Sequence, residues 1–191
     1  MDLKEIAEQI RKCQQCRLAQ GRTNAVPGSG NPHAQIVFVG EGPGKAEDAQ
    51  GEPFVGAAGK FLNTMLESIK MTREDVFITN VVKCRPPDNR DPQEDEIKTC
   101  TSLYLWAQLE LIKPLLVATL GRHSMYEFLP ATAKISAVHG KPVQAVNKRT
   151  GRRFNVLPLY HPAAALYNGG LRETLLEDFK KIPKILENLE K

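Results

Sequence analysis

Short apolar segments that alternate with helix-like segments are the feature that most constrains the fold of this chain. Residues 35–39, 75–82 and 115–120 are mainly apolar and bounded by turn-forming residues, which predicts three buried strands. Two further strands are expected at residues 143–146 and 154–159. Apolar strands alternating with helices are typical of a mostly parallel sheet that is covered on both faces. The sequence therefore predicts an α/β fold.

The helical segments follow from apolar spacing and from capping residues. Helices are expected over residues 2–12, 57–70 and 171–189, the last kinked by Pro183. A long helix to about residue 112 is expected to start at Pro92, with Asp91 as its N-cap and Glu94 completing a capping box. With 191 residues, 41% of them hydrophobic, the chain is expected to fold as one domain, residues 1–191, without disulfide support.

The apolar and charged content also bears on location and partners. The longest apolar run, residues 114–120, is too short to span a bilayer, and the charged N-terminus does not resemble a secretory signal. We therefore expect a cytoplasmic protein with no membrane partner. A net charge of +4 permits a polyanionic partner without requiring one. From charge alone, the basic residues within 148–153 are better explained as a solvated hairpin tip.

Polar side chains stand where three of the predicted strands end. Glu41 and His161 follow two strands, and Asn80 ends a third. Taken singly, each has a bland explanation: a solvated carboxylate, a structural histidine, an amide bonded to nearby backbone. Ligands of such sheets bind beyond the carboxyl ends of the strands. The three side chains together therefore predict a binding site at one edge of the sheet.

The loop after the first strand narrows the class of ligand. Gly40–Gly44 breaks the spacing of a dinucleotide fingerprint, and Pro43 lacks an amide that a phosphate would need. This loop is better interpreted as a rigid turn that presents amides and Glu41 to a small flat ligand. Phe54, on the next loop, is either satellite core or a platform on which a base stacks.

Four cysteines suggest a metal centre. Cys13 and Cys16 form a C-x-x-C pair, and fifteen residues separate Cys84 from Cys100. Buried structural thiols are the bland alternative, but Arg17 and Arg85 adjoin two of the four. Four thiolates suit Zn²⁺ or an iron–sulfur cluster, and the spacing does not separate these.

Taken in order, these motifs resemble the family 4 uracil-DNA glycosylases, an iron–sulfur type found in bacteria and archaea. The similarity covers nearly the whole chain. The matching segments are the C-x-x-C pair, 40–44 with 47–48, 51–56, 79–87 with 89–90, Cys100, and 161–164. Related proteins carry an acidic residue where this chain has Gly42, which leaves Glu41 as the nearest carboxylate.

The resemblance implies a fold, a cofactor and an activity. The implied fold is a three-layer α/β/α sandwich around a four-stranded, mostly parallel sheet, with a small cluster-binding N-terminal segment. The implied cofactor is a [4Fe–4S] cluster. Its expected ligands are Cys13, Cys16, Cys84 and Cys100. The implied activity is monofunctional removal of uracil from single- or double-stranded DNA in base excision repair, with turnover and without abasic-lyase activity.

The resemblance also implies roles for individual residues. Glu41, Asn80 and His161 are the expected catalytic residues. Gly40, Gly42, Phe54, Asn80 and His161 are expected to bind the uracil. Leu166, Tyr167 and Lys141 are expected to contact DNA, with Leu166 or Tyr167 filling the vacated stack. A monomer associated with the nucleoid is expected, and a sliding clamp is a candidate partner.

Two other functions are compatible with parts of the pattern. The chain could be a catalytically idle nucleic-acid-binding module stapled by its metal, or a small electron carrier. The intact set of Glu41, Phe54, Asn80 and His161 argues against both.

Overall fold

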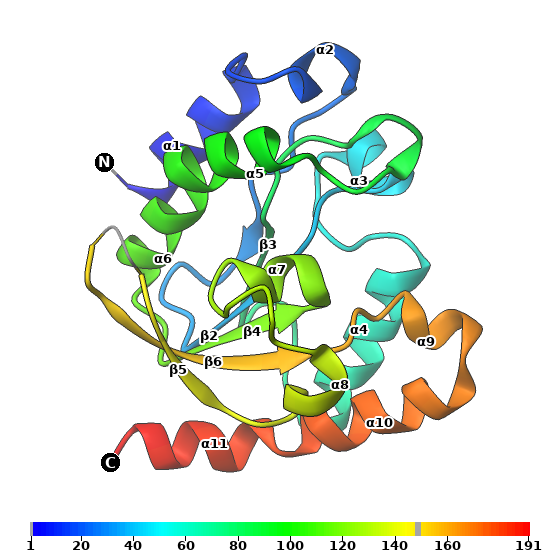
Figure 1. Cartoon of the computed structure of the whole chain (residues 1–191), viewed down its shortest axis with the longest axis vertical. Helices are drawn as coiled ribbons and strands as arrows, with labels where there is room; N and C mark the ends of the chain where they lie inside the picture. Colours follow the sequence, from blue (N-terminus) through cyan, green and yellow to red (C-terminus); the bar gives the residue numbers. More distant parts are fainter. Residues whose placement is uncertain (1, 148–149) are drawn as a thin grey trace.

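The structure is a computed structural model that describes residues 2–147 and 150–191, and it is built on a six-stranded mixed sheet (Figure 1). The strand order is β1-β3-β2-β4-β6-β5. The four inner strands run parallel, and the two edge strands are antiparallel to their neighbours. The strands are β1 (Ser29–Gly30), β2 (Ile36–Gly40), β3 (Phe77–Asn80), β4 (Leu116–Leu120), β5 (Val143–Val146) and β6 (Arg153–Leu159).

The expectation of a four-stranded sheet is therefore wrong in strand number, although an inner set of four parallel strands is present. The predicted strand at residues 143–146 is β5, which pairs with β6 and widens the sheet. The other edge strand, β1, lies in a stretch where the sequence predicts no strand. It has only two residues. One of them, Gly30, packs so closely on the next strand that a Cβ there would lie 2.0 Å from the Val76 carbonyl oxygen, so this position requires glycine. So short and glycine-rich a strand has no apolar pattern to reveal it.

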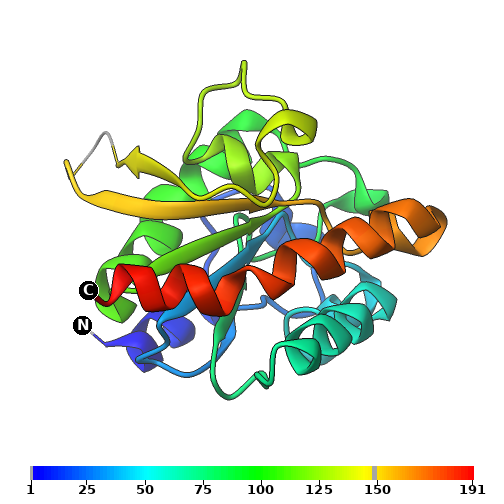
Figure 2. The same cartoon turned by 90° about the horizontal axis from the view of Figure 1, so that it is seen from below.

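Helices cover both faces of the sheet, as expected. Val37 and Val39 point to the layer that contains α1 (Leu3–Lys12) and α6 (Trp106–Ile112). Ile36 and Phe38 point to the opposite layer. That second layer consists of α4 (Ala57–Ser68), α10 (Gly169–Lys180) and α11 (Ile182–Leu189). Figure 2 shows α10 and α11 crossing their side of the sheet in line, with the predicted break falling at Lys181, just before Pro183.

The long helix begins later than predicted. Its N-cap is Gln93, and the capping box pairs Gln93 with Glu96 rather than Asp91 with Glu94. The reason is that Arg90 binds both carboxylate oxygens of Glu96, at 2.7 and 2.9 Å, which holds the preceding residues outside the helix. The helix then continues as α5 (Glu94–Cys100), a π-helical turn at Thr101–Leu105, and α6.

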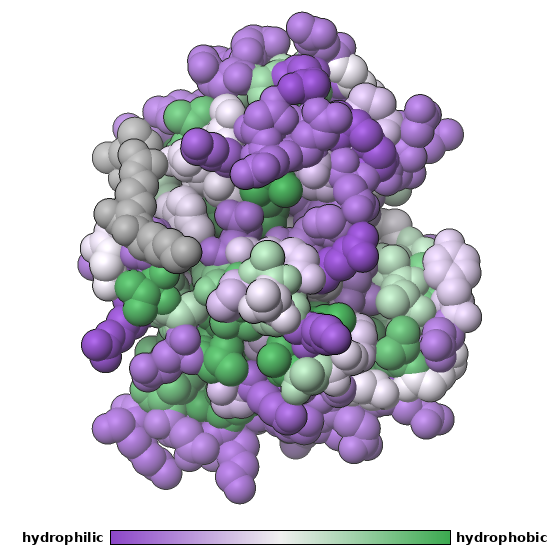
Figure 3. Space-filling view, viewed as in Figure 1, coloured by the Kyte–Doolittle hydropathy of each residue, from purple (hydrophilic) through white to green (hydrophobic). Residues whose placement is uncertain are grey.

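Short helices fill the edge of the sheet where the parallel strands end. They are α2 (Leu18–Gly21), α3 (Lys45–Gln50), α7 (Arg122–Tyr126), α8 (Ile135–Val138), α9 (Ala164–Tyr167) and a 3₁₀ turn at Pro87–Asn89. Hydrophilic residues cover most of the upper part of the face in Figure 3, where α2, α3 and α5 lie. None of the helices described is long and apolar enough to cross a membrane.

Candidate active site

A cavity of about 420 Å³ opens at the carboxyl ends of the parallel strands. The residues that the sequence predicts to bind the base line this cavity, except Gly40, which lies beneath the side chains of Asn80 and Phe54. The lining includes Glu41, Gly42, Phe54, Asn80 and His161. The parallel register explains the convergence, because it places Gly40 of β2 beside Asn80 of β3, and β6 ends two residues before His161.

The floor of the cavity requires a glycine. A Cβ on Gly40 would lie 2.4 Å from Asn80 Oδ1 and 2.7 Å from the Phe54 ring. Any other residue at this position would push both groups out of place. Gly42 is similarly constrained, since its Cβ would lie 2.8 Å from a methyl group of Val82.

Phe54 is held by its main chain. Its φ of +54° is in the left-handed region, which a phenylalanine adopts only when its surroundings enforce it. Arg73 donates to the carbonyl oxygens of both Pro53 and Phe54, the latter at 2.9 Å. A Cβ on Gly59 would lie 1.7 Å from the Phe54 carbonyl oxygen, so α4 can approach this loop only with glycine there. The Phe54 ring stacks on His161 with centroids 5.7 Å apart.

Glu47 is a structural member of the site to which sequence reasoning gave no role. One carboxylate oxygen accepts from the amides of Val55 and Gly56, both at 2.9 Å, and the other accepts from Gly44 at 3.2 Å. Glu47 thereby ties the loop after β2 to the loop that carries Phe54. The sequence does hold a signal for this role: Glu47 lies three residues after Gly44, the N-cap of α3, which is the position from which a glutamate accepts from the N-cap amide. Arg73 had no comparable signal.

His161 is a neutral hydrogen-bond donor. Burial lowers the pKa of its imidazole to about 4, and the Glu47 charge offsets this only in part. The amide of Ala163 donates to Nδ1 at 3.1 Å, so Nδ1 is the acceptor and the proton resides on Nε2. A neutral imidazole with a defined tautomer can donate one N–H to an anion.

Asn80 carries an acceptor without a partner. Its side chain is 1% exposed, and Oδ1 makes no hydrogen bond within the described structure. An unpaired buried acceptor costs about 1–3 kcal/mol. Such a group in a cavity is suited to accept from a ligand N–H.

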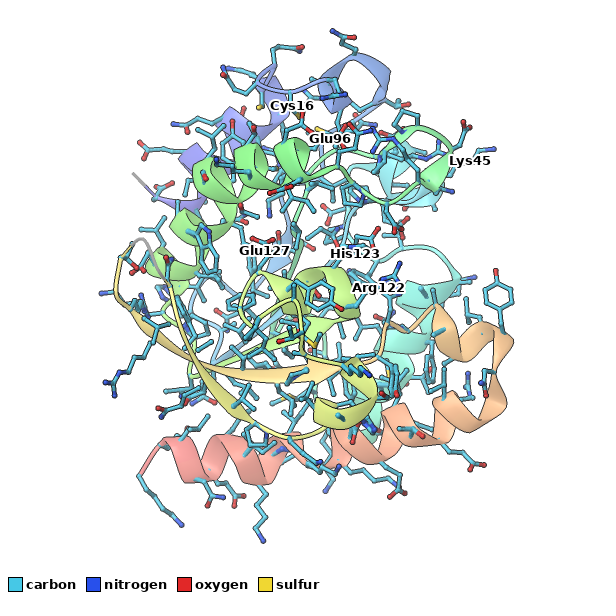
Figure 4. All side chains as sticks on the ribbon, viewed as in Figure 1. Cys16, Lys45, Glu96, Arg122, His123 and Glu127 are labelled. Carbon is cyan, nitrogen blue, oxygen red and sulfur yellow. The ribbon has the colours of Figure 1, made fainter. Side chains whose placement is uncertain are left out.

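Glu41 lies at the rim of the cavity, next to charged residues whose proximity the sequence did not predict. Burial raises the pKa of Glu41, and the nearby His123 opposes the rise. His123 Nε2 lies 3.8 Å from Glu41 and 3.1 Å from Asp91, while Arg122 Nη2 lies 3.1 Å from Asp91. Figure 4 shows Arg122 and His123 together at the start of α7. Asp91 thus pairs with Arg122 and His123 at the rim of the cavity and does not cap the helix.

The four cysteines line one small second cavity. Cys13 follows α1, Cys16 precedes α2, Cys84 follows β3, and Cys100 ends α5. All four are free thiols. Arg22 Nη1 lies 3.0 Å from Cys84 Sγ, and burial raises the pKa of Cys84 and raises that of Cys100 to about 12. Thiols this hard to ionise in isolation are stabilised as thiolates by a bound cation.

The residues expected to contact DNA lie outside the cavity. Leu166 and Tyr167 belong to α9, which follows His161, and Tyr167 is 91% exposed. Lys141 lies beyond α8 and donates to the carbonyl of Ala137 at 3.0 Å. In the predicted basic cluster, Arg152 binds Glu110 at 2.7 Å, whereas Lys148 and Arg149 lie outside the described residues.

Comparison with known proteins agrees with this geometry. Residues 27–189 match the model of the uracil DNA glycosylase superfamily. This chain belongs to that superfamily. A type-4 uracil-DNA glycosylase of Sulfurisphaera tokodaii is 52% identical over 188 residues, which cover 96% of this chain and 84% of the relative. Those of Saccharolobus solfataricus and Archaeoglobus fulgidus are 52% and 49% identical, over 96% of this chain and 86% and 92% of theirs. This superfamily member therefore resembles its type-4 relatives along nearly its whole length.

Proposed function

We propose that this superfamily member removes uracil from DNA by hydrolysing its N-glycosidic bond, which leaves an abasic site for repair. The observation that carries the proposal is the unpartnered Oδ1 of Asn80, buried in a cavity beside the Phe54 ring and a neutral His161. A base inside a duplex cannot reach such a cavity, so the uracil nucleotide must be flipped out of the stack.

Asn80 supplies the choice of base. Its Oδ1 accepts from N3–H of uracil, and its Nδ2 donates to O4. Cytosine presents an acceptor at N3 and a donor at N4, which would leave both polar atoms of Asn80 unsatisfied in the orientation that this amide has in the structure. Mismatches of this kind reject an analogue by about 10⁴-fold or more. Phe54 contributes stacking that does not depend on the base.

His161 and Glu41 serve the bond cleavage. As the bond between N1 and C1′ breaks, its electron pair passes to the uracil ring, and negative charge grows on O2. The Nε2–H of His161 and amides of the 40–44 loop stabilise this charge. Glu41 orients a water that adds its oxygen to C1′, and it takes up the water proton. A carboxylate whose pKa is raised by burial suits that role.

The exposed residues of α9 engage the DNA. Leu166 and Tyr167 fill the space that the flipped nucleotide leaves, and Lys141 contacts phosphate. The finer expectations of one domain over residues 1–191, a monomer, a sliding-clamp partner and association with the nucleoid stay predictions.

We assign the second cavity to a [4Fe–4S] cluster held by Cys13, Cys16, Cys84 and Cys100. Four thiolates around one zinc ion lie about 3.8 Å apart, from Zn–S bonds of about 2.3 Å. Among the described residues, the potential metal ligands within 4.8 Å of one another are Glu41, Asp91 and His123, and the thiols form no such group. Their wider spread suits a cluster, which would join the N-terminal segment to the sheet and would lie outside the cavity that takes the base.

The proposal is tested by product analysis. Metal-replete protein in excess is incubated with an oligonucleotide that carries one uracil, and mass spectrometry follows the free base. Release of uracil, with a strand break only after alkali, is the expected result. A strand break without alkali would contradict the monofunctional assignment. Uracil that stays bound in the oligonucleotide would contradict the proposal.

A further inference from the structure

Lys83 is a fully buried lysine that the mechanism above does not use. Its side chain is 1% exposed, in the turn that follows β3. Its ammonium group makes three hydrogen bonds, to Thr79 Oγ1 at 2.5 Å, Gln108 Oε1 at 2.7 Å and the main-chain oxygen of Asn80 at 2.7 Å. These bonds use all three of its protons, and each acceptor is a neutral group.

One of these bonds reaches the base-reading residue directly. The main-chain oxygen that Lys83 binds belongs to Asn80, whose side chain lines the base cavity. The other two bonds fix the ammonium against rigid parts of the fold. Gln108 stands on α6 and donates to the Pro27 carbonyl oxygen at 2.7 Å, and Thr79 Oγ1 lies 3.1 Å from the same oxygen. Lys83 therefore connects Asn80 to the helix layer that contains the thiols.

On its other side, Lys83 lines the thiol cavity. The walls of that cavity include Lys83 and Arg22 together with the four cysteines. A buried ammonium without a carboxylate needs a counter-charge nearby. A four-thiolate metal centre is an anion, because the thiolates outweigh the charge of the metal. Two cations, Lys83 and Arg22, thus face a group that would carry the opposite charge.

We propose that Lys83 is a positioning residue that holds Asn80 in its uracil-reading geometry and has the metal–thiolate centre as its counter-ion. The inference rests on the proposed function, and it gives the centre a task at a distance from the chemistry. Metal loading stabilises the buried ammonium, and the ammonium fixes the end of β3. Uracil selection thereby depends on the metal–thiolate centre and on Lys83, neither of which touches the base.

The test compares Lys83→Met with Lys180→Met. Methionine keeps the length of the side chain but removes the charge and the donors. Lys180 is exposed on α10 and lines neither cavity. Each variant is assayed for iron content, for calorimetric affinity for free uracil, and for affinity for an undamaged oligonucleotide. We expect Lys83→Met with full iron content to bind uracil about tenfold more weakly or worse, with unchanged affinity for undamaged DNA. Uracil affinity within twofold of wild type would overturn the inference.

The counter-ion relation has a readout that is independent of uracil. Reduction adds negative charge to the cluster, and a buried cation nearby favours that reduced state. Redox titration of the visible absorption should therefore give a more negative midpoint potential in Lys83→Met and an unshifted one in Lys180→Met. An unshifted potential in Lys83→Met would refute the relation.

Thr79→Val keeps the inference testable if Lys83→Met fails to fold. Valine has the shape of threonine and removes one acceptor while the ammonium remains. We expect weaker uracil binding and a shifted Asn80 side-chain amide resonance at full iron content. An unshifted resonance with wild-type uracil affinity would refute the positioning role. If wild-type protein itself neither binds nor excises uracil, the proposed function fails rather than this inference.

Discussion

Replacing Asn80 by alanine should damage function without damaging stability. In the free protein, Asn80 Oδ1 is buried without a hydrogen-bond partner, so folding already bears the cost of its desolvation. Uracil recovers this cost when its N3–H binds. In Asn80→Ala, the N3–H and O4 of the bound base would instead be left unpaired. Each unpaired group costs about 1–3 kcal/mol, so excision of uracil should slow by about 10²-fold or more.

The effect on stability should be near zero or favourable. Alanine removes the unsatisfied acceptor, which offsets the packing lost from a side chain that lies against Gly40 and Phe54. Asn155→Ala is the matched control, because the Asn155 side chain donates to the Leu115 carbonyl oxygen at 3.0 Å. Losing that satisfied bond should cost about 1 kcal/mol, equivalent to a Tm lower by about 2–4 °C for a chain of this size.

The assay pairs thermal melting with single-turnover excision. Oligonucleotides that carry uracil or cytosine at one position are compared for wild type, Asn80→Ala and Asn155→Ala. We expect Asn80→Ala to keep its Tm and lose most of its preference for uracil, and Asn155→Ala to do the reverse. A lowered Tm with full uracil preference in Asn80→Ala would show that Asn80 is a structural amide.

Three further predictions concern the same site. The pKa of His161 in the folded protein is about 4. Between pH 6.5 and pH 4 the unfolded protein therefore takes up a proton at His161 and the folded protein does not. The contribution of the neutral imidazole to stability is thus complete above pH 6.5 and is lost as the pH falls toward 4. Urea unfolding at pH 7.5 and pH 5 should show about 1–2 kcal/mol of this loss in wild type and none of it in His161→Gln, and equal losses would contradict the neutral imidazole. Gly59→Ala should lower the rate of uracil excision and also the Tm, because its Cβ would lie 1.7 Å from the Phe54 carbonyl oxygen; wild-type kinetics would show that Phe54 need not be held there. Glu41→Gln should slow single-turnover excision by about 10²-fold or more with unchanged DNA affinity, and full activity would move the water-orienting role elsewhere.

The sequence predicted the site better than it predicted the edges of the sheet. Apolar strands signal a parallel sheet, and such a sheet brings residues after β2, β3 and β6 to one edge whatever the loops do. Glu41, Asn80 and His161 were therefore placed together from their positions alone. The strand β1 was missed because two residues bonded through backbone groups leave no side-chain pattern.

The particular partners of charged side chains were beyond sequence reasoning. The start of the long helix was misplaced because Arg90 and Glu96 outweigh the local signal of Asp91 and Pro92. The bond from Arg73 to the Phe54 loop depends on which segments the fold brings together, and the bond from Lys83 to the Asn80 main chain depends on how the chain turns after β3. No spacing rule in the sequence encodes such pairs.

The most direct test of the central claim is single-turnover cleavage of a matched set of labelled oligonucleotides. They carry uracil opposite guanine, uracil opposite adenine, uracil in a single strand, and thymine opposite guanine. With metal-replete protein in excess, we predict alkali-dependent breaks at uracil and none at thymine. Absence of cleavage at every uracil, with the iron content intact, would contradict the assignment of this cavity to uracil excision.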